Sequence, residues 1–287
     1  MEAFADPAAV EAALAEAGYL ADPEIAQVVF LADRLDKPIL AEGPAGVGKT
    51  ALALALAEAT GRRLVRLQCY EGLDEARALY EWDYHKQLLR LQADAGGRWE
   101  ELEADIFSEP FLLARPLLEA IRSPAPVVLL VDEVDRVEVE TEALLLEVLD
   151  SFQVTIPELG TMRAVTTPLV VLTSNSTREL SEALKRRCLY LPVEYPSIER
   201  ERQILRARVP DLPERLAVKI AETVAAIRDL GLRKPPSVSE TLDWARTLLA
   251  LGIDELGAEV TAATLNVLLK HRADIERTTK ELSLESR

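Results

Sequence analysis

A glycine-rich segment that joins an apolar run to a helical segment constrains this chain more than any other feature. The pattern GxxxxGK[ST] is matched by Gly43-Pro44-Ala45-Gly46-Val47-Gly48-Lys49-Thr50. The apolar run Pro38–Ala41 precedes it, and the helix-forming segment Ala51–Ala59, closed by Gly61, follows it. In such a loop the backbone N–H groups and the helix N-terminus point at phosphate oxygens. The sequence therefore predicts that residues Gly43 to Ala51 bind nucleotide phosphates.

Acidic and hydroxyl side chains supply the rest of a nucleotide site. We expect Lys49 to contact the β- and γ-phosphates and the Thr50 hydroxyl to ligate Mg²⁺. The apolar run Val127–Val131 ends in Asp132 and Glu133, and unpaired carboxylates at the tip of a buried strand cost desolvation free energy. We therefore expect Asp132 in the metal shell and Glu133 beside the attacking water.

Five short apolar runs alternate with helical patterns, which is typical of a parallel sheet with helices on both faces. The runs are Pro38–Ala41, Leu64–Cys69, Val127–Val131, Leu169–Thr173 and Leu189–Val193. The predicted fold class is α/β, a five-stranded parallel sheet between helical layers as in P-loop NTPases.

The strand signals stop after Pro196, and only helical patterns follow. Ser237 and Glu240 have the spacing of a capping box. The predicted helices are Ser197–Arg208, Pro213–Leu230, Val238–Ala250 and about Thr261–Leu282. We therefore predict a nucleotide-binding domain over residues 1–196 and an all-helical domain over residues 197–287.

Two segments interrupt the alternation within the first domain. An insert over about residues 70–110 contains Tyr80, Trp82 and Tyr84 and a predicted turn at Gly96-Gly97, and a helical segment, Phe111–Ile121, follows it. Residues 152–168 alternate in period two about Gly160, which predicts a hairpin. Its tip, residues 158–160, is expected to have no core to join.

Polar residues beside the last two strands are further candidates. Asn175 follows the fourth run, where an amide can hold the water or the γ-phosphate; a turn asparagine is the alternative. Arg186 and Arg187 precede the fifth run and fit either a solvated face or an arginine finger. As a finger they would serve a neighbouring chain, which requires an oligomer.

Composition narrows the function classes. The net charge of −16 argues against an extended nucleic-acid surface. Two separated cysteines and two isolated histidines match no zinc or haem pattern. No apolar run approaches the ~20 residues of a membrane span, and the acidic N-terminus is unlike a signal peptide, so we expect a cytoplasmic protein. Neither asparagine begins an NKxD motif, which favours adenine over guanine.

These motifs together resemble those of AAA+ ATPases, in particular the MoxR-like branch with a helix-2 insert and a pre-sensor hairpin. The segments Cys69–Asp74, Tyr80–Tyr84, Leu113–Leu118 and Lys234–Ala245 further resemble CoxD-type chaperones, which mature carbon monoxide dehydrogenase. The resemblance covers about Gly18 to Leu251.

The resemblance implies a role for each motif. Gly43–Thr50 corresponds to Walker A, Asp132-Glu133 to Walker B, Asn175 to sensor 1, and Arg187 with Arg186 to the finger. It also implies an ATP-driven hexameric ring with Mg²⁺, a metalloenzyme client and a von Willebrand A-domain partner.

One position departs from the MoxR-like pattern. Relatives often carry a sensor 2 arginine in a Ser-Pro-Arg context, whereas this chain has Arg233-Lys234-Pro235-Pro236. We expect Arg233 or Lys234 to contact the nucleotide instead.

Two other functions stay open on the sequence. The first is a nucleic-acid remodeller, against which the acidic balance counts. The second is a nucleotide switch that binds ATP without hydrolysis and acts as a scaffold. The presence of Glu133, Asn175 and Arg187 together counts against that switch.

Overall fold

The computed structural model describes residues 3–93 and 98–282 of the chain, which divides into two compact units. The sheet unit comprises Met1–Glu42 and Lys49–Pro192, and the helical unit comprises Gly43–Gly48 and Val193–Arg287. No helix among the described residues is long and apolar enough to cross a membrane. The domain boundary that the sequence places at Pro196 stays a prediction.

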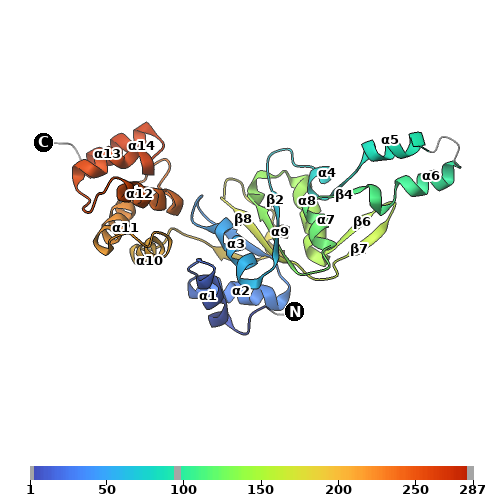
Figure 1. Ribbon diagram of the computed structural model, residues 1–287, viewed down its shortest axis with the longest axis horizontal. Helices are drawn as coiled ribbons and strands as arrows, with labels where there is room; N and C mark the ends of the chain where they lie inside the picture. Colours follow the sequence, from blue (N-terminus) through green and yellow to red (C-terminus); the bar gives the residue numbers. More distant parts are fainter. Residues whose placement is uncertain (1–2, 94–97, 283–287) are drawn as a thin grey trace. The chain divides into compact units, whose positions relative to one another are not determined.

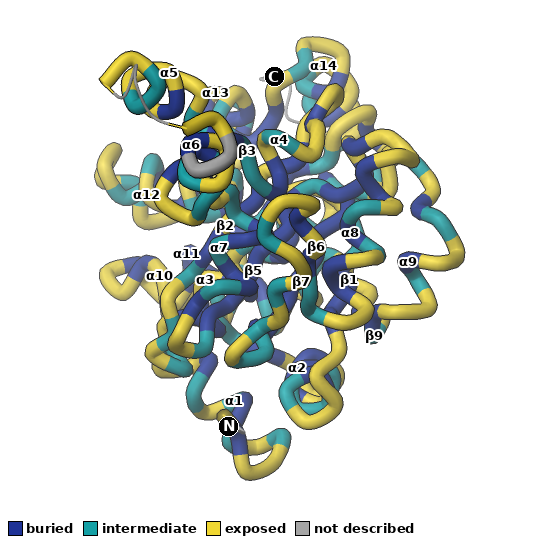
Figure 2. Tube along the Cα trace, turned by 90° about the vertical axis from the view of Figure 1, so that its right-hand side faces the viewer, coloured by how far each residue is buried: buried dark blue, intermediate teal, exposed yellow. Residues whose placement is uncertain are grey.

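The sheet unit is built on five parallel strands in the order β2-β5-β8-β1-β9. The predicted α/β fold class is confirmed, and Figure 1 shows the helices beside this sheet. Every residue of β5 and β8 is buried, as the continuous apolar runs predict. Figure 2 shows β5 in the colour of buried residues. The strands are β1 (Ile39–Glu42), β2 (Arg63–Gln68), β5 (Val127–Asp132), β8 (Leu169–Ser174) and β9 (Leu189–Pro192).

Helices of the sheet unit flank these strands. The helix that follows the glycine-rich loop begins at Lys49 and buries Leu52 and Leu56 on its inner side. The elements are α1 (Pro7–Glu16), α2 (Pro23–Leu35), α3 (Lys49–Thr60), α4 (Glu75–Ala78), α5 (Tyr84–Ala93), α6 (Trp99–Ile106), α7 (Pro116–Ile121), α8 (Val139–Ser151), α9 (Glu182–Arg187) and the 3-10 turns η1 (Glu109–Phe111) and η2 (Val134–Arg136).

The helix predicted over Phe111–Ile121 is wrong in its first half. Residues Leu112–Ala114 form strand β4, which pairs antiparallel with β3 (Tyr80–Trp82), and α7 begins only at Pro116. Proline restricts the residue before it to extended backbone, and Arg115 has φ −96° and ψ 172°. Pairing with β3, a strand about thirty residues earlier in the chain, makes residues Leu112–Ala114 a strand. The local sequence pattern does not contain this partner and therefore predicts a helix.

The insert contributes to the core and also projects from it. Trp82 is buried and packs edge-on against Phe107, with ring centroids 5.3 Å apart. Helices α5 and α6 extend away from the sheet (Figure 1) and carry exposed Tyr84, Leu88 and Trp99. The turn predicted at Gly96-Gly97 lies outside the described residues.

The hairpin segment pairs β6 (Gln153–Ile156) with β7 (Gly160–Arg163) antiparallel. The expectation that its tip has no core to join is wrong, because Leu159 and Met162 pack against the main hydrophobic core of the sheet unit. A single apolar side chain in a turn gives no periodic signal, so sequence reasoning missed this anchor.

The helical unit packs its helices around a fully buried Trp244, whose ring N–H donates to the Thr264 hydroxyl at 2.8 Å. The capping box of Ser237 and Glu240 is present. The helices are α10 (Ile198–Arg208), α11 (Glu214–Arg228), α12 (Val238–Ala250), α13 (Ala258–Leu268) and α14 (Arg272–Glu281).

The single helix predicted over Thr261–Leu282 is instead two helices. Leu269 has extended backbone (φ −113°, ψ 133°) and is buried in the core of the helical unit. The turn it begins lets α14 fold back, so that Asp274 accepts from the backbone N–H groups of Arg233 and Lys234. Burial of Leu269 and these long-range bonds override the helical periodicity.

A buried ion pair ties the helical unit together. Arg228 of α11 binds both carboxylate oxygens of Glu201 of α10, donates from Nε to the Pro236 carbonyl at 2.9 Å, and lies over the Tyr195 ring. The Glu201 side chain is 1% exposed and that of Arg228 is 8% exposed. Among the residues that the structure describes, Glu201 is the carboxylate that pairs with this guanidinium and compensates its charge.

We predict that Glu201→Ala destabilises the protein by about 3–5 kcal/mol, because it leaves a buried guanidinium unpaired. The control is Asp243→Ala, which removes an exposed pair with Arg246 and should cost at most ~1 kcal/mol. Urea unfolding monitored by circular dichroism measures both. Equal losses in the two variants would show that the buried pair has no special role.

Candidate functional site

The loop Gly43–Gly48 is held against residues that follow β9. A Cβ atom on Gly43 would lie 1.9 Å from the Val193 carbonyl oxygen. At Gly46, where φ is 76°, a Cβ atom would lie 2.3 Å from the Cβ of Ser237, and the Gly46 carbonyl accepts from the Val238 N–H at 3.1 Å. Close backbone approach therefore requires glycine at both positions, in addition to any need of a phosphate.

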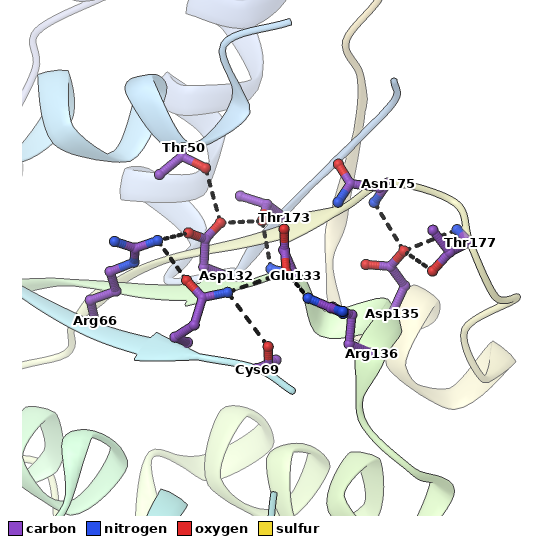
Figure 3. A network of polar contacts seen from close by, with 11 residues as sticks. Thr50, Arg66, Cys69, Asp132, Glu133, Asp135, Arg136, Thr173, Asn175 and Thr177 are labelled. Atoms are coloured by element: carbon purple, nitrogen blue, oxygen red, sulfur yellow. Dashed lines mark hydrogen bonds and ion pairs between the residues drawn. The ribbon is translucent and has the colours of Figure 1, made fainter. Parts of the chain in front are cut away.

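The first residues of α3 contact the ends of two strands. Lys49 is buried, and its Nζ donates to the Asn175 side-chain oxygen at 2.9 Å. The Thr50 hydroxyl donates to Oδ1 of Asp132 at 3.0 Å (Figure 3). The structure thus brings together four of the residues that the sequence selected, from α3, β5 and the turn after β8.

Asp132 is buried and receives two further donors. The Thr173 hydroxyl donates to its Oδ1 at 2.6 Å, and an Arg66 guanidinium nitrogen lies 2.5 Å from its Oδ2. The Arg66 side chain is half exposed. The ion pair neutralises the buried carboxylate while one of its partners stays in contact with solvent.

Glu133 has strained backbone. Its φ of 57° and ψ of 50° place a residue other than glycine in the left-handed region, which costs about 1–3 kcal/mol. Its N–H donates to the Thr173 hydroxyl at 2.9 Å, which holds this conformation. Its carboxylate contacts Arg136 at 3.0 Å and the Gln68 amide at 3.4 Å. The Glu133 side chain is thereby held at the carboxyl end of β5.

Burial and the nearby carboxylates shift the pKa of Lys49 in opposite directions. Burial lowers the pKa of its ammonium below the ordinary value, and the nearby carboxylates, first Asp135 and then Asp132 and Glu133, offset this in part. A partly desolvated cation among several anions suits a ligand that carries its own negative charge.

Arg186 and Arg187 lie elsewhere in the sheet unit. Arg187 forms an ion pair with Asp150 of α8, and both arginines line a hollow of about 450 Å³ between α8 and α9. Arg187 comes just before β9, whose Leu189 pairs with Ile39 at the start of β1. Lys49 follows the opposite end of β1, on the order of 10 Å further along at ~3.3 Å per residue. The structure therefore does not join these arginines to the Lys49 cluster.

The remaining two candidates belong to the helical unit. The backbone N–H groups of Arg233 and Lys234 donate to Asp274 at 3.0 and 3.2 Å, and the Lys234 ammonium lies 3.8 Å from Glu240. Contact of either side chain with a nucleotide stays a prediction.

Sequence reasoning missed several residues that contact the site acids. Arg66 and Gln68 alternate within an apolar strand, and such polar residues near a strand end are a usable signal. Thr173 and Asp135 gave no local signal, because their partners come from other parts of the chain.

The donor set fits Mg²⁺. A hydroxyl and a carboxylate, from Thr50 and Asp132, are hard oxygen ligands. Within residues 3–93 and 98–282, no cluster of three or more His, Cys, Asp or Glu could hold a metal by itself. This set matches the habit of Mg²⁺, which takes one or two carboxylates and completes its shell with waters and substrate phosphates.

The chain is similar to one known protein family and to several solved structures. The ATPase family associated with various cellular activities (AAA) matches residues 39–192, more than half of the chain. Similar solved structures include a mutant of Thermotoga maritima RuvB (17% identity, TM-score 0.48, covering 92% of this chain and 71% of that chain). The Thermotoga maritima RuvB Holliday junction branch migration motor is also similar (18% identity, TM-score 0.45, covering 84% and 66%). Both likenesses concern the fold alone. From the match over β1 to β9, the chain belongs to the AAA family of ATPases.

Proposed function

We propose that this chain binds and hydrolyses ATP with Mg²⁺. The observation that carries the proposal is the pair of hydrogen bonds from α3, Lys49 to Asn175 and Thr50 to Asp132, which gather the four side chains. The loop Gly43–Gly48, with Ala51 behind it, would wrap the phosphates, and Lys49 would contact the β- and γ-phosphates.

Each polar group then has a task. Thr50 and Asp132 would hold Mg²⁺, which supplies charge neutralisation to the phosphate oxygens when bound. Glu133 polarises the attacking water, and Asn175 orients that water or the γ-phosphate. Arg66 and Gln68 keep the two acids in place before nucleotide arrives.

Glu133→Gln should leave ATP binding near wild type and lower the turnover rate by ~10²–10⁴-fold, the usual contribution of a positioned general base. The amide keeps the shape of the side chain but accepts protons poorly. Nucleotide affinity and steady-state phosphate release measure the two effects. Glu138→Gln, at an exposed glutamate five residues on, is the control. Unchanged hydrolysis in Glu133→Gln would remove Glu133 from the mechanism, whereas ATP binding without any hydrolysis by the wild-type protein would favour the non-hydrolysing switch.

We further propose that Arg187, with Arg186 beside it, completes the site of a neighbouring copy in a hexameric ring. The support is its place beside the start of β1, away from the Lys49 cluster, and its exposed ion pair with Asp150, which is weak enough to exchange for phosphate. Members of this family typically form rings, in line with this reading.

If Arg187 acts in trans, Lys49→Ala and Arg187→Ala rings should each be inactive, and mixed rings should recover activity at interfaces that combine an intact Lys49 with an intact Arg187. The control mixes Lys49→Ala with the Lys49→Ala/Arg187→Ala double variant, which offers no such interface. Phosphate release after subunit exchange measures the recovery. Inactive mixtures with exchange demonstrated would refute the trans assignment.

We propose that the chain uses ATP hydrolysis as a MoxR-like remodelling chaperone that acts on a protein client. Exposed Tyr84, Leu88 and Trp99 on α5 and α6, together with the net charge of −16, suit a protein surface better than a phosphate backbone. The resemblance of four segments to CoxD-type chaperones supports an apo-metalloenzyme of the carbon monoxide dehydrogenase type as the proposed client, with a von Willebrand A-domain protein as the proposed partner. DNA binding that weakens with salt would instead favour a nucleic-acid remodeller.

We further propose that the tip of the β6–β7 hairpin, with part of the insert, couples ATP hydrolysis to the protein partner, and a double variant tests this. Glu158→Ser with Val165→Ser changes exposed side chains and leaves Leu159 in the core. Basal ATPase activity should persist, whereas stimulation by the partner and the apo-metalloenzyme should fall at least several-fold. Leu35→Ser, an exposed position on α2, is the control. Full stimulation of the hairpin variant would place the coupling elsewhere.

A further inference from the structure

A buried carboxylate that the proposed mechanism does not use lies beside the candidate site. Asp135, in the turn η2 after Glu133, is 3% exposed. A single oxygen, Oδ2, accepts three hydrogen bonds: from the Asn175 N–H at 3.2 Å, the Thr177 N–H at 2.9 Å and the Thr177 hydroxyl at 2.6 Å (Figure 3). The turn after β5 is thus fastened to the turn after β8.

The fastened turn is strained. Ser176, between the two residues that donate to Asp135, has φ of 57°, a conformation that residues other than glycine rarely adopt. Strained backbone persists where surrounding contacts over-determine it. Asp135 binds the residue on each side of Ser176, so it supplies such contacts directly.

We propose that Asp135 is a positioning residue that holds the turn Asn175–Thr177 and so sets where the Asn175 amide meets Lys49 and the γ-phosphate. The inference deepens the proposed ATPase function and rests on it for the role of Asn175. The Asn175 amide already accepts from the Lys49 ammonium at 2.9 Å, so a displaced turn moves one of the two groups aimed at the terminal phosphate.

The charge state of Asp135 agrees with a fixed acceptor. Burial alone would raise the pKa of its carboxyl group, but the hydrogen bonds from Thr177 and Asn175 outweigh burial and lower that pKa below the ordinary value. Its other oxygen, Oδ1, is buried and has no hydrogen-bond partner in the part of the chain that the structure describes. Of the two carboxylate oxygens of Asp135, Oδ2 therefore accepts the hydrogen bonds from Asn175 and Thr177.

Because Oδ2 alone accepts these hydrogen bonds, the substitution Asp135→Asn can separate the loss of the charge from the loss of the hydrogen bonds. In Asp135→Asn the amide oxygen can take the place of Oδ2 and keep all three bonds, and the NH₂ group replaces an oxygen that makes none. Asp135→Ala removes the three acceptor contacts. A matched control is Glu142→Gln, because Glu142 is also buried and binds the Arg178 guanidinium and the Ser181 N–H, which follow the turn that Asp135 holds.

The first measurement is amide hydrogen exchange of the full-length protein, which does not depend on catalysis. Asp135→Ala should speed exchange at Asn175 and Thr177 at least 10-fold, Asp135→Asn should restore most of the protection, and Glu142→Gln should leave these two amides protected. Unchanged exchange in Asp135→Ala would overturn the proposal.

The second measurement is the ratio of affinities for Mg-ATPγS and Mg-ADP, which isolates the γ-phosphate contact. Asp135→Ala and Asn175→Ala should each lower the preference for the triphosphate about 10-fold, and the double variant should fall no further. Additive losses would overturn the proposed route through Asn175. Faster exchange in Asp135→Ala with an unchanged preference in Asn175→Ala would keep Asp135 as the clamp of the turn and refute instead the role proposed for Asn175.

Discussion

The parallel pairing of β5 with β8 is the constraint on which the candidate site depends. Parallel strands end at the same edge of a sheet, so the turns that follow Asp132 and Ser174 meet there without any further instruction. Thr173 then links them, because its hydroxyl donates to Asp132 and accepts from the Glu133 N–H. One side chain thereby holds the acid proposed for the metal and the strained backbone of the acid proposed for water.

Several carboxylates lie at the same edge of the sheet, and two cations that differ in their exposure to solvent compensate this negative charge. Lys49 is buried and hydrogen-bonded to Asn175, whereas Arg66 reaches Asp132 from a half-exposed position. The Arg66 guanidinium is half exposed, but its partner Asp132 is buried, so release of Arg66 alone would leave that carboxylate without this charge compensation. Lys49 and Arg66 thus offset the carboxylates of this edge from a buried and a half-exposed position, respectively.

The helical unit depends on a different kind of interaction. Its buried Arg228–Glu201 pair and the Trp244–Thr264 hydrogen bond are satisfied internally, so the unit has a core of its own. The loop Gly43–Gly48 packs on this unit through Gly46, although the sequence places it between β1 and α3 of the sheet unit. Glycine at these positions is required by packing, in addition to the phosphate access that we propose for the loop.

The sequence by itself determined the five parallel strands, the glycine-rich loop, the two acids at the end of β5 and the capping box at Ser237, because each of these depends on residues that are neighbours along the chain. Only the tertiary structure decided the strand Leu112–Ala114, the break at Leu269 and the roles open to Arg66, Thr173 and Asp135. In each of these cases the deciding partner is a distant segment. A local pattern records periodicity, turn chemistry and charge, but a hydrogen bond across forty residues becomes visible only when the strands that carry its two ends lie side by side.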